Sequence, residues 1–375
     1  MKFSHLRILN IRNHKKTIIE FNPGINILWG DNGAGKTSIL ESLSICGFSK
    51  SFVNSKDLTL MNHLADNYLI EAKLFNDYEI PYKIKIFYEP HKKKVISSTY
   101  GDNLLPKDII GKIPMIILAP DMKNITNGPP EYRRQFVDRI LSQESYEYFE
   151  NLMNYKKALK QRNAILFKLK NSNLLDLTQY NTWTKIFINL AEKIIIKRAK
   201  FINDFNLFFK ETYNKIFKEN EKVELIYKPD FITLKNDNFS GQLNMIAKNL
   251  EKDEIIRATS LFGPHKDDFL IKINDGIAKD VASQGQHKSL LIALKFAEFQ
   301  YLKTNKQETP VIILDDIFSE LDEERISNVF SMTCEYKAQT FISTTDPKRI
   351  KNFFNNGTNV SYYQIKNGAI VDKKK

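Results

Sequence analysis

The chain has 375 residues, a length that suffices for two or three domains with buried cores. Its formal net charge of +12 favours an anionic partner such as nucleic acid, although a biased genomic composition rich in Lys, Asn and Ile has the same effect. The two cysteines, Cys46 and Cys334, exclude a disulfide framework and suit a reducing compartment. We find no signal-peptide pattern and no apolar run near the roughly 20 residues of a spanning helix, and we expect a cytoplasmic protein without a membrane partner.

A phosphate-binding loop (Walker A) is the first functional motif along the chain. It follows an apolar strand at 25–29 and precedes a helical run at 38–45. In this context glycines let backbone N–H groups surround a triphosphate, Lys36 neutralises the β- and γ-oxygens, and the Thr37 hydroxyl ligates Mg²⁺. The residues expected to bind ATP are Gly30, Asp31, Asn32, Gly33, Ala34, Gly35, Lys36 and Thr37.

Strand patterns dominate the next part of the chain. Residues 68–72, 82–88 and 94–96 alternate between apolar and polar side chains, which predicts antiparallel strands with one buried face. The apolar run at 114–118 predicts a further, fully buried strand.

From Pro130 the pattern becomes helical. Leu152, Leu159 and Leu166 stand at heptad spacing, a polar break lies near 171–173, and a second long helix is expected from about Gln179 to Phe217. Two antiparallel helices that form an arm are the natural interpretation, and a locally packed hairpin is simpler than a coiled coil. Basic side chains along both helices form a candidate surface for DNA phosphates or an ordinary solvated face: Lys156, Lys157, Lys160, Arg162, Lys168, Lys170, Lys193, Lys197, Arg198 and Lys200.

The segment Ala282-Ser283-Gln284-Gly285-Gln286 opens an amphipathic helix with apolar residues at a 3.6-residue period. A serine in this position caps a helix, and the helix N-terminus with its hydroxyl also offers donors to an anion. The segment precedes a buried strand at 311–314 that ends in Asp315 and Asp316, which we interpret as a Walker B strand. Asp315 is expected to hold Mg²⁺ beside the phosphate loop, and Asp316 is expected to polarise the attacking water.

Together these motifs resemble the RecF family of bacterial recombination and repair ATPases. The resemblance spans essentially the whole chain and includes Leu6–Glu20, Ser51-Phe52, Gly128-Pro129, Arg133–Asp138, Gln161–Asn163 and, most specific to the family, Gly263–Asp268. The signature segment at Ser283 and the stretch Asp315–Asp322, which contains Ser319, Glu320, Leu321 and Asp322, are shared with ABC-type ATPases more widely.

The resemblance implies an α/β fold in which an ABC-type ATPase lobe, built on a mixed sheet with flanking helices and antiparallel strands, carries an inserted helical arm. The expected ranges are 1–128 and 261–375 for the two halves of the ATPase lobe and 129–260 for the arm. In such ATPases the signature serine of one subunit completes the nucleotide site of another, so Ser283 joins Lys36 and Asp316 as a catalytic candidate and ATP is expected to close a homodimer.

The resemblance further implies binding to gapped, single-stranded or double-stranded DNA, RecA loading with RecO and RecR, and support of replication restart and the SOS response. The chain departs from the usual ABC pattern at three places. Thr344-Thr345-Asp346 stands where a switch histidine is usual, Ala119–Met122 stands where a glutamine loop is usual, and Asp316 replaces a glutamate. These departures favour slow ATP hydrolysis, with ATP acting as a binding switch. A structural ATPase like those of SMC proteins and an ABC transporter subunit remain alternatives. His265 and Arg133 are more often structural than catalytic in such settings.

Overall fold

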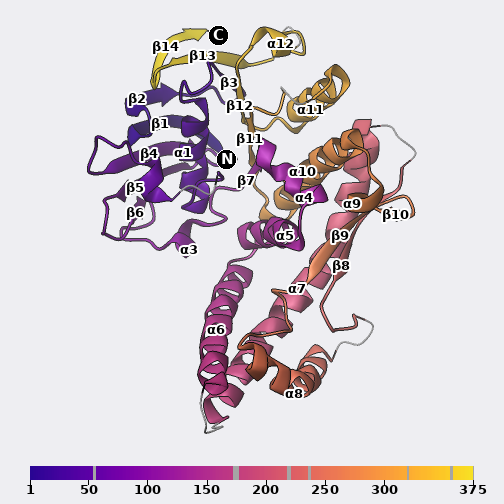
Figure 1. Ribbon diagram of the computed structural model, residues 1–375. Coiled ribbons are helices and arrows are strands. Elements are labelled where there is room, and N and C mark those ends of the chain that lie inside the picture. The colour runs from indigo at the N-terminus through magenta and orange to yellow at the C-terminus, as the bar shows by residue number, and fades with distance from the viewer. Residues whose placement is uncertain are drawn as a thin grey trace. The chain divides into compact units, whose positions relative to one another are not determined.

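The computed structural model describes residues 1–53, 56–171, 177–217, 221–234, 238–318, 321–354 and 358–374. The chain divides into two compact units (Figure 1). Unit 1 consists of Met1–Lys123, Glu211–Asn220 and Ser283–Lys375, and unit 2 consists of Asn124–Lys210 and Glu221–Ala282. The expected α/β ATPase lobe with a helical insertion is confirmed.

A six-stranded mixed sheet forms the centre of unit 1, in the order β14-β13-β3-β12-β11-β7. Five strands are parallel, and β14 is antiparallel to β13. The residues of β7, β11 and β12 are all buried, as parallel strands covered on both faces require. The strands are β3 (Ile25–Trp29), β7 (Met115–Leu118), β11 (Val311–Asp315), β12 (Thr340–Thr344), β13 (Val360–Lys366) and β14 (Ala369–Lys374).

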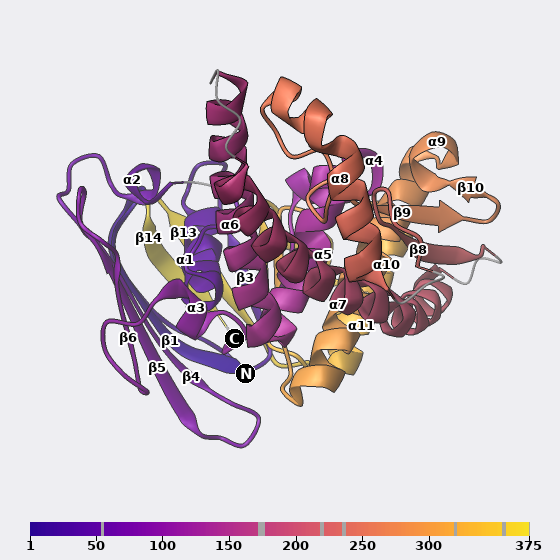
Figure 2. The ribbon, with the colours of Figure 1, turned by 90° about the horizontal axis from the view of Figure 1, so that it is seen from below.

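An antiparallel sheet forms a second layer of unit 1, in the order β2-β1-β4-β5-β6. Burial alternates along β4 and β5, which confirms the predicted antiparallel strands. Helix α1 (Lys36–Phe48) contacts both β1 and β4 of this sheet and β11 and β12 of the mixed sheet, and Figure 2 shows it between the two layers. The strands are β1 (Lys2–Ile11), β2 (His14–Glu20), β4 (Tyr68–Phe75), β5 (Pro81–Tyr88) and β6 (Val95–Ser98).

The remaining helices of unit 1 cover the mixed sheet and its loops. Helix α10 (Gln284–Lys306) packs along edge strand β7 and against α11 (Glu323–Tyr336), where the Phe299 and Tyr336 rings stack with centroids 4.5 Å apart. The short helices are α2 (Asp57–Leu60), α3 (Pro106–Ile109), the 3₁₀ helix η1 (Pro120–Lys123) and α12 (Lys348–Lys351).

Unit 2 contains the predicted arm. Tyr155 of α6 stacks on Phe187 of α7, with ring centroids 5.0 Å apart, and Arg162 of α6 bonds Thr184, so the two helices run antiparallel. A three-stranded sheet in the order β10-β9-β8 completes the unit. The elements are α4 (Asn124–Asn127), α5 (Pro130–Glu144), α6 (Tyr146–Lys170), α7 (Thr178–Phe217, whose last turns belong to unit 1), β8 (Val223–Lys228), α8 (Phe239–Arg257), β9 (Asp268–Ile273), β10 (Gly276–Ile277) and α9 (Ala278–Val281).

The second boundary of the insertion differs from the expected one. The sequence places the return to the ATPase lobe at residue 261, whereas residues 261–282 belong to unit 2. The reason is that β9 pairs with β8 along its whole length, from Val223–Ile273 to Lys228–Asp268, instead of joining the ATPase sheet. None of the helices in the described ranges is long and apolar enough to cross a membrane.

Candidate functional site

The phosphate loop connects β3 to α1, as the sequence predicts. Gly35 has φ 112°, and a Cβ atom there would lie 2.4 Å from Nε2 of His14, so both backbone and packing require glycine. At Gly30, with φ 152°, a Cβ atom would lie 2.2 Å from the carbonyl oxygen of Ile365. The loop is therefore enclosed on both sides by neighbouring segments of unit 1.

Lys36 is the buried cation of this loop. Its Nζ donates to the carbonyl oxygens of Gly30 (2.7 Å) and Asp31 (2.9 Å). Burial lowers the pKa of Lys36, and the nearby carboxylates, Asp316 first among them, act in the opposite direction. Phosphate oxygens are charged acceptors and offer this ammonium group a stronger interaction than the loop carbonyls do.

Thr37 and Asp315 come together although they lie far apart in the sequence. Thr37 Oγ1 donates to Asp315 Oδ1 at 3.0 Å, and Ser343 Oγ donates to the same oxygen at 2.6 Å. Burial raises the pKa of Asp315, and the hydrogen bonds from Ser343 and Thr37 partly oppose that shift. One hydroxyl and one carboxylate beside a phosphate loop fit Mg²⁺, which takes few protein oxygens and fills its other positions with water and phosphate.

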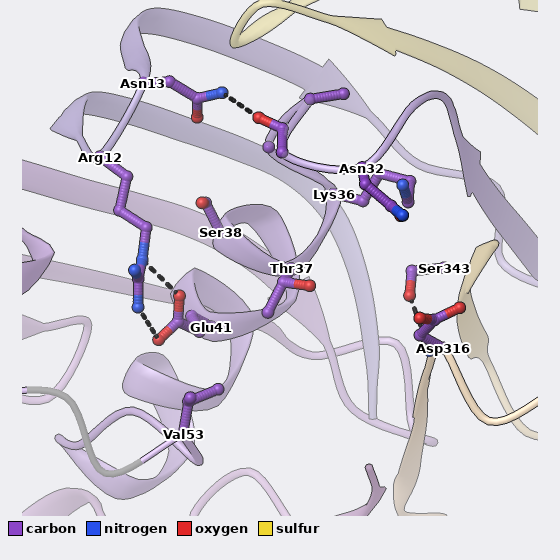
Figure 3. A pocket seen from close by; sticks show the side chains of 13 residues that line it. Arg12, Asn13, Asn32, Lys36, Thr37, Ser38, Glu41, Val53, Asp316 and Ser343 are labelled. Atoms are coloured by element: carbon purple, nitrogen blue, oxygen red, sulfur yellow. Dashed lines mark hydrogen bonds and ion pairs between the residues drawn. The ribbon is translucent and has the colours of Figure 1, made fainter. Parts of the chain in front are cut away.

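Asp316 follows at the end of β11 with φ 49°. Its N–H donates to Ser343 Oγ at 2.9 Å, and its side chain lines a pocket of about 480 Å³ together with Lys36 and Thr37 (Figure 3). The pocket thus brings together the Lys36 cation, the Thr37 hydroxyl and the Asp316 carboxylate, and Thr37 in turn bonds Asp315. Asp31 and Asn32 are exposed, and Asn32 lines the pocket while Asp31 contributes its carbonyl to Lys36.

The pocket also contains residues that the sequence reasoning did not select. Arg12 forms a two-bond ion pair with Glu41, at 2.8 and 3.0 Å, and Ser51 Oγ donates to Glu41 at 2.6 Å. Asn13 Nδ2 donates to the carbonyl oxygen of Gly33 at 3.0 Å (Figure 3). A signal was present for Glu41, because an acidic residue within the apolar run of α1 needs a buried partner.

Ser283 caps α10 and is not among the described residues that line this pocket. Its Oγ accepts from the Gln286 N–H at 3.2 Å, and its own N–H donates to Gln286 Oε1 at 2.7 Å. Ser283 and Gln284 are exposed, so the helix N-terminus is open to solvent. Downstream of Asp316, Ser319 and Glu320 lie outside the described residues, while Leu321 is buried and Asp322 caps α11.

Two of the basic residues proposed for DNA contact are buried in unit 2, so that part of the prediction is wrong. Arg162 pairs with Glu254 and also bonds Tyr180 and Ser260, and Arg198 pairs with Asp138 (2.9 Å) and Asp267 (3.0 Å). Lys197 bonds Glu144 at 2.9 Å. The other proposed residues are exposed: Lys156, Lys157, Lys160, Lys168, Lys170, Lys193 and Lys200.

His265 and Arg133 both have structural partners. The Tyr155 hydroxyl lies 2.6 Å from His265 Nδ1, the Ser260 carbonyl oxygen lies 3.3 Å from Nε2, and burial lowers the pKa of His265 to about 4. Arg133 donates to both carboxylate oxygens of Asp268, at 2.8 and 2.9 Å. These partners account for both side chains without a catalytic role.

The chain is similar to known proteins in its sequence. A protein family described as AAA domain matches residues 5–356. The DNA replication and repair protein RecF of Chloroherpeton thalassium (strain ATCC 35110 / GB-78) is 33% identical over 355 residues, which cover 93% of this chain and 96% of that relative.

Solved structures resemble the whole chain. A structure of the recombination mediator protein RecF-ATP in the RecFOR pathway superposes with a TM-score of 0.90 at 25% identity, covering 100% of this chain and 98% of the other. The SmcHead bound to the C-winged helix domain of ScpA has a TM-score of 0.57 at 14% identity, covering 99% and 98% of the two chains, and shares the fold alone.

Proposed function

Since the chain belongs to the RecF family of DNA replication and repair proteins, we propose that it is an ATP-dependent DNA-binding protein of recombinational DNA repair. The observation that carries this proposal is the pocket at the phosphate loop, which Lys36, Thr37 and Asp316 line and where Thr37 bonds Asp315. ATP is the bound nucleotide, in keeping with the RecF-ATP structure that superposes on the chain.

The proposed chemistry is slow hydrolysis of ATP. Loop N–H groups and Lys36 hold the phosphates, and Thr37 and Asp315 would hold Mg²⁺, which neutralises phosphate charge when bound. Asp316 accepts a proton from the attacking water, and Ser343 fixes the backbone from which Asp316 projects. In this proposal, hydrolysis ends the ATP-bound state and so resets the protein as a binding switch.

ATP is proposed to close a homodimer through Ser283. The exposed N-terminus of α10 presents a hydroxyl and the backbone N–H groups of its first turn, which suit the γ-phosphate held by a second copy of the chain. Closure of two such sites would make DNA retention depend on ATP.

The exposed lysines of α6 and α7 are the proposed contacts to DNA phosphates. Lys156, Lys157 and Lys160 lie on consecutive turns of α6 and are exposed, so they neutralise phosphates without reading bases. We extend this proposal to the pathway of the family. The protein is then expected to bind gapped DNA, to act with RecO and RecR in loading RecA, and to support replication restart and the SOS response. The alternative of an SMC-like structural ATPase has the shared fold in its favour but requires a much longer coiled coil than α6 and α7 provide.

Oligomeric state on gapped duplex DNA tests the proposal. With ATP and Mg²⁺ the wild type is expected to become a DNA-bound dimer in gel filtration with light scattering, and Lys36→Ala is expected to stay a monomer and bind DNA weakly. Lys156→Glu, Lys157→Glu and Lys160→Glu together are expected to weaken DNA binding about tenfold or more, with a smaller salt dependence and unchanged ATP affinity. A wild type that binds no ATP, or binds DNA equally with and without it, contradicts the proposal.

A further inference from the structure

Three consecutive carbonyl groups of the phosphate loop accept hydrogen bonds from outside the loop. Gly33 O accepts from Asn13 Nδ2 at 3.0 Å, Ala34 O accepts from the Gly368 N–H at 2.9 Å, and Gly35 O lies 2.9 Å from His14 Nε2. These donors come from two hairpin turns, one between β1 and β2 and the other between β13 and β14. Each turn lies far from the loop in sequence.

The two turns also contact each other. Thr17 Oγ1 lies 3.0 Å from Gly368 O and 2.8 Å from His14 Nδ1. Gly368 has φ 74°, and a Cβ atom there would lie 2.1 Å from the carbonyl oxygen of Asn13. The turns and the loop therefore form one hydrogen-bonded cluster, which we call the carbonyl clamp: Asn13, His14, Thr17 and Gly368.

The clamp determines where the N–H groups of the loop point. A peptide unit is planar and trans, so a carbonyl held on one side directs the following N–H to the opposite side. Holding Ala34 O and Gly35 O outward thus turns the N–H groups of Gly35 and Lys36 toward the pocket. Because these bonds restrain the loop from outside, the loop has less conformational freedom to lose when phosphate binds.

His14 suits this task in its neutral form. Its side chain is fully buried, and burial lowers its pKa. A carbonyl oxygen only accepts, so the ring proton of neutral His14 belongs at Nε2, where it donates to Gly35 O. The Thr17 hydroxyl has a single proton, which it donates to Gly368 O, so Thr17 joins the two turns through that bond.

We propose that the carbonyl clamp presets the phosphate loop, so that Asn13, His14 and the Gly368 turn are positioning residues for nucleotide binding. The inference rests on the nucleotide site proposed above and extends it to residues of two hairpins outside the phosphate loop. Loss of one clamp bond leaves a loop carbonyl without its partner and lets the following N–H turn away from the phosphate.

ATP affinity of His14 variants tests the clamp. His14→Leu fills the volume without a donor, and we expect ATP to bind about tenfold more weakly in an equilibrium titration with Mg²⁺. His14→Gln keeps an N–H near the position of Nε2, and we expect an affinity within about threefold of wild type. Lys15→Ala, an exposed neighbour on the same hairpin, is the matched control and should bind ATP like wild type.

Thermal unfolding accompanies each titration so that only folded variants are compared. Thr17→Val keeps the shape of the side chain and removes its hydroxyl, so it tests the same cluster at a second position. It should weaken ATP binding less than His14→Leu. A folded His14→Leu protein with wild-type affinity, or a His14→Gln protein as weak as His14→Leu, overturns the clamp. If instead the wild type and Lys36→Ala bind ATP equally poorly, the proposed nucleotide site fails and not the clamp alone.

Discussion

Asp316 combines a constrained backbone with a proposed catalytic role. Its φ of 49° is uncommon for residues other than glycine, and asparagine tolerates this conformation at least as well as aspartate. Asp316→Asn should therefore keep the fold and ATP binding but lower ATP turnover by about 10²-fold, because the amide cannot accept the water's proton. A long-lived ATP-bound dimer in gel filtration is the expected companion result, and turnover at the wild-type rate would leave Asp316 as a structural neighbour of Asp315.

His265 predicts a pH dependence of the stability of unit 2. Burial holds its folded pKa at about 4, below the value of 6.5 expected when unfolded, so the unfolded chain binds more protons between these values. The free energy of unfolding should fall as pH decreases from 6.5 toward 4, by at most about 3 kcal/mol. Urea denaturation at pH 7 and pH 5 measures this loss, and His265→Gln should show a smaller difference between the two pH values than wild type.

At the scale of elements, α6 and α7 are joined by a buried polar cluster as well as by apolar contacts. Arg162 of α6 and Glu254 of α8 are both fully buried, and Arg162 also bonds Thr184 and Tyr180 of α7. Ile165, Leu166, Leu169 and Tyr180 form an apolar cluster between α6 and α7. Arg162→Met leaves the Glu254 carboxylate buried without its partner, and we expect a loss of about 3–5 kcal/mol in the free energy of unfolding.

Comparison with a double variant distinguishes a lost pair from lost packing. Arg162→Met with Glu254→Met should recover much of the stability, since no charge then remains unpaired in the interior. Lys157→Ala on the exposed face of α6 is the matched control, expected to change stability by less than about 0.5 kcal/mol. Equal destabilisation by the single and double variants would contradict the role assigned to the pair.

For the whole molecule, the decisive question is whether Ser283 acts on a second copy. Ser283→Arg should leave ATP binding by the monomer nearly unchanged and block ATP-dependent dimerisation, because its bulk occupies space meant for the neighbour's γ-phosphate. Ser283→Ala loses the same helix cap, a cost of about 1 kcal/mol, without the added bulk, and so separates capping from closure.

Mixing variants tests the sharing directly. A dimer of Ser283→Arg and Lys36→Ala chains contains one composite site with both defects and one with neither. Recovery of ATP turnover on mixing would support sites shared between subunits. Loss of nucleotide binding by the isolated Ser283→Arg monomer would instead mean that Ser283 acts within its own chain.

Motifs with strong local signals were predictable from the sequence. The strand, loop and helix around Lys36 and the buried strand before Asp315 follow from apolar runs and glycine spacing within short windows. Burial of Arg162 was missed because its partner Glu254 lies far along the chain. Arg162 does lie three residues after Leu159, and so on the same helix face as Leu152, Leu159 and Leu166. Similarly, no local pattern shows that β9 pairs with β8 instead of entering the ATPase sheet.

The strand order of the mixed sheet has a consequence for how the protein is made. Strand β3, which carries the phosphate loop, pairs on one side with β12 and on the other with β13, both encoded near the far end of the message. A nascent chain on the ribosome therefore lacks both neighbours of β3 until translation has passed residue 344, and it lacks one of them until translation has passed residue 366. Fragments that end before Thr340 lack both strands that flank the phosphate-loop strand, so interrupted synthesis leaves that strand without its parallel neighbours.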